Sequence, residues 1–143
     1  MGAGGLLRDE EGNLIRGFKT RISASSHLDA ELQALSLGLE LVRQRDQRFW
    51  IELGDQEVVA MLIAEKYGSA NTRHRVTEIR NKLKYMTLRI SFIPKEGNKV
   101  AIWLAEQGSK ESHRFDFNHN TASARTKAMV RMDQIGMPNF QFG

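Results

Sequence analysis

The chain has 143 residues, of which 41% are hydrophobic, 27% are charged and none is cysteine. This length suits one domain with its own core and leaves no room for a second domain of ordinary size. The lack of cysteine excludes a disulfide scaffold, a thiolate metal site and a cysteine nucleophile, and no apolar run approaches the ~20 residues of a membrane-spanning helix. With no secretory signal visible at the N-terminus, we expect an intracellular protein with no membrane partner.

The formal net charge of +4 is concentrated in one segment. Residues 73–84 carry five basic side chains against one acid, Glu78, so the rest of the chain is balanced. The five are Arg73, Arg75, Arg80, Lys82 and Lys84. A basic patch is the electrostatic signature of a protein that contacts phosphates, so we expect these residues to bind nucleic acid. A solvated helix face is an equally good explanation of the same pattern.

The first half of the chain predicts a hairpin followed by a helix. Two short apolar runs, 2–8 and 14–19, flank the turn residues 9–13 and predict two antiparallel strands. Ser26 and Asp29 have the spacing of a helix N-terminal cap. Leucines then recur at helical spacing, which predicts an amphipathic helix to about residue 44.

The second half predicts further strands and helices in mixed order. Residues 48–53 and 88–93 are rich in β-branched and aromatic residues, which predicts strands. Residues 56–67, 73–86 and 98–107 have helical periodicity. The order predicts a mixed α/β domain over residues 1–108, and residues 109–143 are predicted to be a partly ordered C-terminal extension.

Two acidic residues stand out by their position. Glu31 lies at the edge of the apolar stripe of the first helix, where an unpaired carboxylate costs several kcal/mol unless a partner or a metal binds it. Asp55 directly follows a predicted buried strand, and ligand sites form at the carboxyl ends of strands in α/β sheets. Each also has a purely structural explanation, because the helix dipole favours an acid near the N-terminus and Asp is a preferred N-cap.

Taken together, these motifs resemble the ribonuclease H-like family, and most closely its plant branch, which is related to the ribonuclease H domains of reverse transcriptases. The resemblance covers residues 2–108, and residues 132–136 are similar to the family's closing segment. The motifs that carry it are the Gly-Ala-Gly-Gly opening at 2–5, the helix motif Ala-Glu-Leu-Gln-Ala-Leu at 30–35, Asp55 with the two valines at 58 and 59, and Glu-Gly-Asn-Lys-Val-Ala at 96–101.

This resemblance implies hydrolysis of the RNA strand of an RNA–DNA hybrid by four carboxylates that hold two Mg²⁺ ions. It makes Glu31 and Asp55 two of the four. The family's first Asp lies on a strand before the glycine motif, which Met1 directly precedes here, and the position of the last Asp holds Ile102. We therefore expect a remnant of the catalytic site that binds at most one Mg²⁺, and weakly.

The family's first strand is central in its sheet, between the hairpin and the strand that ends in Asp55. We expect it to be missing here because of a truncated N-terminus. Either another chain supplies this strand, or its neighbours pair directly in a rearranged sheet, or the chain is a truncated remnant. A donated strand would make the open sheet a binding site for a partner protein.

Three functional hypotheses follow. The leading one is an RNA- or RNA–DNA hybrid-binding domain with a degenerate two-metal nuclease site and weak or lost catalysis. The second is a non-catalytic protein-binding component of a ribonucleoprotein assembly. The third is an active Mg²⁺-dependent ribonuclease that uses Asp9 or Glu52 as replacement acids. The four histidines, His27, His74, His113 and His119, are too scattered in the sequence to predict a metal cluster.

Overall fold

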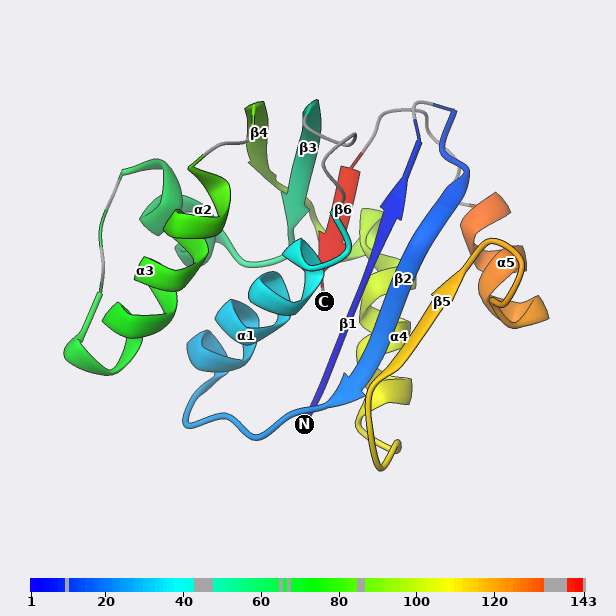
Figure 1. The fold of residues 1–143 in the computed structure, drawn as a ribbon, viewed down its shortest axis with the longest axis horizontal. Helices are drawn as coiled ribbons and strands as arrows, with labels where there is room; N and C mark the ends of the chain where they lie inside the picture. The colour runs from blue at the N-terminus through cyan, green and yellow to red at the C-terminus, as the bar shows by residue number, and fades with distance from the viewer. Residues whose placement is uncertain are drawn as a thin grey trace.

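The computed structural model contains a mixed β-sheet with helices on both faces (Figure 1). It describes residues 1–9, 11–42, 48–64, 66, 68–84, 87–132 and 139–142. The strands are β1 (Gly2–Arg8), β2 (Leu14–Arg21), β3 (Arg48–Leu53), β4 (Thr87–Phe92), β5 (Phe115–Asn118) and β6 (Asn139–Phe142). The helices are α1 (His27–Leu39), α2 (Gln56–Ile63), α3 (Ala70–Leu83), α4 (Lys99–Gly108) and α5 (Ala124–Met132), with a 3-10 turn, η1, at Lys95–Gly97. The strand order in the sheet is β4-β3-β6-β1-β2-β5.

The hairpin of β1 and β2 lies between β6 and β5 in the sheet. Its turn is held by Asp9, whose Oδ1 accepts hydrogen bonds from the backbone N–H groups of Glu11 and Asn13 at 2.9 and 2.8 Å. Gly12 has a φ of 83°, which few other residues adopt. On β1, a Cβ atom at Gly4 would lie 2.6 Å from the backbone nitrogen of Ala105, so the glycines of the opening motif let α4 pack closely on this strand.

The sheet separates two hydrophobic cores, with α1 in front of it and α4 behind it in Figure 1. Side chains alternate along β1, so Leu7 faces the core with α1, α2 and α3, whereas Leu6 faces the core with α4 and α5. On β3, Ile51 and Leu53 belong to the core on the α1 side. The apolar stripes of α1, α2 and α4 pack on the sheet, whereas α3 packs on α1 and α5 packs on α4.

The central position of the sheet is occupied by the C-terminal strand of the same chain. β6 pairs antiparallel with β1, from Gly5 opposite Phe142 to Arg8 opposite Asn139, and parallel with β3. It thus lies where the resemblance places the family's first strand. This arrangement was not among the three expected outcomes. The gap expected between β1 and β3 is occupied by β6 of the same chain, so it does not remain open for a strand from another chain.

The other predicted elements agree with the structure within a few residues. The hairpin, the strand at 48–53 and the helix beginning at residue 56 are confirmed. Helix α3 begins at Ala70, earlier than predicted, because Ser69 ends the preceding loop with an extended backbone. The predicted helix ends at residues 44, 67 and 86 are too late, since α1 ends at Leu39, α2 at Ile63 and α3 at Leu83, each followed by described residues that are not helical. Most of the closing motif at 132–136 falls outside the described residues. Residues 109–143, expected to be an extension, contribute β5, α5 and β6.

Among the described residues, no helix combines the length and apolar character needed to cross a lipid bilayer.

Candidate metal and nucleic-acid site

The first site residues lie at the start of α1. The hydroxyl of Ser26 caps this helix by accepting a hydrogen bond from the backbone N–H of Asp29 at 3.0 Å. His27 is the first residue of the helix, and Glu31 follows four positions later, so the two share a helix face. Glu31 is buried at the edge of the apolar stripe, and His27 is exposed beside it.

Asp55 reaches the same place from the sheet. It follows β3 and caps α2, since its Oδ1 accepts hydrogen bonds from the backbone N–H groups of Glu57 and Val58 at 2.8 and 3.1 Å. These two bonds fix the carboxylate, and its other oxygen, Oδ2, lies 3.4 Å from His27 Nε2. The predicted convergence of Glu31 and Asp55 is present in the structure: one ligand atom from each residue and from His27 lie within 4.8 Å of one another.

The electrostatics of this site are unfavourable for Glu31. Burial raises the pKa of the Glu31 carboxyl, the neighbouring His27 lowers it, and the carboxylate of Asp55 raises it further, so that the pKa lies above its ordinary value. The imidazole of His27 lies beside this carboxylate, with Nε2 3.7 Å from Glu31 Oε1. The protein therefore holds two carboxylates together without a lysine or arginine between them, among the described residues.

The positions expected to provide further carboxylates do not provide them. β6 has the sequence Asn-Phe-Gln-Phe and contains no acid. Ile102 is half-buried on α4 and has no ligand atom. Asp9 is engaged in its turn. Glu52 is buried on β3 between Ile51 and Leu53, so the alternation of the strand directs it to the opposite sheet face from α1.

The basic residues of the segment 73–84 divide into two groups. Three are half-buried and contact neighbouring elements. Arg75 pairs with Asp29 of α1, Arg80 donates to the carbonyl oxygens of Met61 and Lys66, and Lys82 lies 2.9 Å from the Ser36 hydroxyl and 3.4 Å from Glu78. The other two, Arg73 and Lys84, are exposed. Three of the five basic side chains of this segment therefore help to pack α3 against its neighbours.

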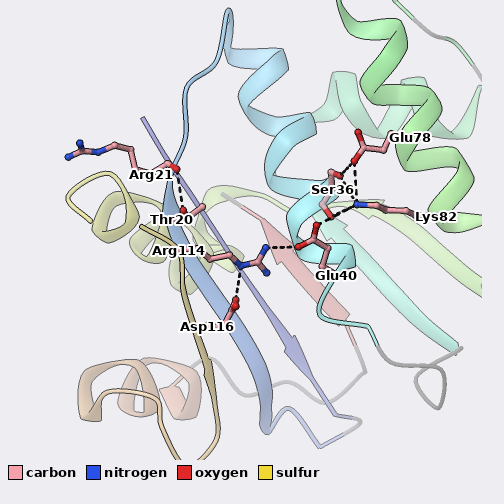
Figure 2. A network of polar contacts seen from close by, with 8 residues as sticks. All are labelled: Thr20, Arg21, Ser36, Glu40, Glu78, Lys82, Arg114 and Asp116. Carbon is pink, nitrogen blue, oxygen red and sulfur yellow. Dashed lines mark hydrogen bonds and ion pairs between the residues drawn. The ribbon is translucent and has the colours of Figure 1, made fainter. Parts of the chain in front are cut away.

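The ion pairs of this region continue from α3 across α1 to β5 (Figure 2). Glu40 lies 3.9 Å from Lys82 and 2.6 Å from Arg114, and Arg114 also binds Asp116. Burial lowers the pKa of Arg114, but the hydrogen bonds and ion pairs with Asp116 and Glu40 together outweigh burial and raise it above its ordinary value. Glu40, Arg114 and Asp116 also line a cleft of about 570 Å³ near the end of α1. Arg114 is thus paired with two acids inside the cleft, which Arg16 also lines.

His27 is the site residue that the sequence interpretation missed. The sequence predicted no metal site from the four histidines together, because they are far apart in the chain. The informative signal was the spacing of four residues between His27 and Glu31, which places both on one face of a helix.

Comparison with known proteins supports the architecture. A sequence model of the reverse transcriptase-like family matches residues 1–108. No protein with a curated description matches the chain significantly. Among solved structures, ribonuclease H1 from the halophilic archaeon Halobacterium salinarum NRC-1 superposes with a TM-score of 0.69 at 20% sequence identity, over 75% of this chain and 83% of that one. The chain thus has a ribonuclease H-like fold and belongs to the reverse transcriptase-like family.

Proposed function

We propose that this protein is a ribonuclease H-like domain that binds RNA or an RNA–DNA hybrid, and that its two-metal nuclease site is degenerate, with weak or lost catalysis. The observation that carries the proposal is the composition of the site. Glu31 and Asp55 converge, but the other two positions expected to bear acids hold Ile102 and the Asn-Phe-Gln-Phe strand β6.

The deficit of oxygen ligands is the physical basis for weak catalysis. Mg²⁺ requires near-octahedral oxygen coordination, and two ions that share a site are held together by bridging carboxylates. Two carboxylates and one imidazole do not fit a pair of Mg²⁺ ions. A single Mg²⁺ on Glu31 and Asp55 would neutralise part of their charge, but the second ion that stabilises the leaving oxygen would lack ligands.

Phosphate binding is supported by the position and charge of α3. This helix packs beside α1, and Arg75 of α3 contacts Asp29, which lies between His27 and Glu31 in sequence. This helix carries the exposed cation Arg73, and the exposed Lys84 is its C-cap. A nucleic acid near the carboxylates would meet these cations, whereas the charges of Arg75 and Lys82 are offset by the acids they pair with.

Binding can be tested by fluorescence anisotropy with a labelled RNA–DNA hybrid at several salt concentrations. We expect affinity to fall steeply with salt, because bound cations release counterions from the phosphates. Replacing both Arg73 and Lys84 by Gln should reduce the slope of log K against log salt by about 1 to 2. The matched control replaces Lys99 and Lys110, which are exposed at either end of α4 on the other sheet face. A salt-independent affinity, or equal losses in both double variants, would contradict the proposed surface.

Catalysis is tested separately with the same hybrid and excess Mg²⁺. We expect cleavage by the wild type to equal that by Asp55→Asn, a variant that keeps the Oδ1 acceptor capping α2. Clear Mg²⁺-dependent cleavage that the variant abolishes would instead establish an active ribonuclease, and the proposed loss of catalysis would be wrong.

A further inference from the structure

The carboxylate site contains a nitrogen ligand that a magnesium site does not need. Imidazole nitrogen binds zinc and other first-row transition metals well, whereas Mg²⁺ is bound by carboxylate, carbonyl and water oxygens. His27 directs Nε2 between Glu31 and Asp55, at 3.7 Å from Glu31 Oε1 and 3.4 Å from Asp55 Oδ2. The chemistry of the three ligand atoms therefore differs from that of an all-oxygen site.

The distances between these atoms suit one small cation. Zinc binds histidine nitrogen and carboxylate oxygen at about 2.0–2.2 Å, so the ligand atoms of a tetrahedral site lie roughly 3.3–3.5 Å apart. The two distances from His27 are close to this value, and all three atoms lie within 4.8 Å of one another. Movement of the Glu31 carboxylate by about one ångström would complete three corners of a tetrahedron.

The two carboxylates are placed to receive a cation. Asp55 has one oxygen fixed by its capping bonds, which leaves Oδ2 for a metal. The Glu31 side chain is only 9% exposed, and among the described residues no hydrogen-bond donor reaches its carboxylate. A buried carboxylate without hydrogen bonds is costly, and a bound cation would remove that cost. His27 is 76% exposed, so the site opens to solvent and water can supply the remaining ligand.

We propose that His27, Glu31 and Asp55 form a site for a single divalent transition-metal cation of the zinc class, in place of a pair of Mg²⁺ ions. The proposed site goes beyond the proposed nucleic-acid binding and does not depend on it. Its distinguishing feature is His27, because Glu31 and Asp55 alone would bind hard cations such as Mg²⁺ without favouring zinc.

The test is a titration of the metal-free protein with Zn²⁺, followed by calorimetry and by competition with a chromophoric chelator, in the absence of nucleic acid. We expect one equivalent to bind to the wild type, and its affinity to fall at least tenfold in His27→Ala and in His27→Gln. Glu31→Gln and Asp55→Asn should lose affinity as well. Binding of Mg²⁺ should be weak and unchanged by either His27 substitution.

The matched control is His74→Ala, which removes another exposed histidine from a helix without touching the site. It should bind Zn²⁺ as the wild type does. Thermal unfolding in EDTA shows that each variant is folded, and added Zn²⁺ should raise the unfolding temperature of the wild type and His74→Ala but not of the His27 variants. Equal Zn²⁺ affinity in the wild type and both His27 variants, or no stoichiometric Zn²⁺ binding at all, would overturn the proposal, whatever the outcome with RNA–DNA hybrid.

Discussion

Replacing Glu31 by Gln should stabilise the metal-free protein. The substitution keeps the size of the side chain and removes a buried negative charge that lies within 4.8 Å of the Asp55 carboxylate by the nearest ligand atoms. At this separation the repulsion is about 3 kcal/mol for an effective dielectric constant of ~20, and water near the exposed His27 reduces it. We expect a gain of about 1–3 kcal/mol in the free energy of unfolding, or roughly 3–10 °C in the unfolding temperature.

The pH dependence of this gain follows from the pKa of Glu31. Burial and the Asp55 carboxylate hold this pKa above its ordinary value, so the folded state favours the protonated acid. The stability that Glu31 contributes is therefore present below its ordinary pKa of 4.5 and is lost as the pH rises through the raised pKa. The difference between Glu31→Gln and the wild type should be small at pH 4 and largest near pH 8.

The assay is thermal or urea unfolding in EDTA across this pH range. Glu40→Gln serves as a control of opposite sign, because Glu40 is half-exposed and binds Arg114 at 2.6 Å, so its loss should cost up to about 1 kcal/mol. If Glu31→Gln unfolds at the same temperature as the wild type or lower at pH 8, then the buried charge of Glu31 and its repulsion with Asp55 do not destabilise the protein, and the reasoning is wrong.

Three further perturbations test the fold. Burial raises the pKa of Asp29, but hydrogen bonds from Ser25, Arg75 and Gln33 outweigh this effect and lower it below its ordinary value. Asp29→Asn should therefore cost about 1–3 kcal/mol at pH 7, measured by urea unfolding, and the loss should shrink as acid protonates the wild-type carboxylate; a pH-independent loss would contradict this. Gly4→Ala places a Cβ 2.6 Å from the Ala105 nitrogen and should lower stability by about 1–3 kcal/mol, whereas unchanged thermal unfolding would show that α4 shifts without strain. Deleting residues 139–142 leaves β1 and β3 without their shared neighbour, so calorimetry should show no cooperative transition, and a native-like transition would argue against a central β6.

Local patterns predicted most of the elements and the meeting of Glu31 with Asp55. The leucine spacing of α1 and the capping residue Ser26 act within a few residues of one another, so the sequence contains the whole signal. The burial of Glu31 followed from its place beside the apolar stripe. The convergence with Asp55 was predicted only through the resemblance to the ribonuclease H-like family, because each acid taken alone also had a structural explanation as a helix-terminus or N-cap residue.

Interactions between distant segments could not be predicted in the same way. The four residues of β6 have no pattern that selects β1 and β3 as neighbours, because that choice depends on which strand edges the rest of the chain leaves open. The sequence also could not show which residues the cations of α3 contact. Arg75 and Lys82 contact Asp29 and Ser36, which are 46 residues away from them in each case, and only the packing of α3 beside α1 brings them together.

The position of β6 has a consequence for biosynthesis. Residues 5–8 pair with residues 139–142, so the chain must leave the ribosome through residue 142 before the middle of the sheet can close over a loop of about 130 residues. Closing a loop of this size costs about 3 kcal/mol more in chain entropy than closing the turn between β1 and β2. Before β6 emerges, the edges of β1 and β3 that it pairs with are open, which exposes the nascent chain to aggregation during synthesis.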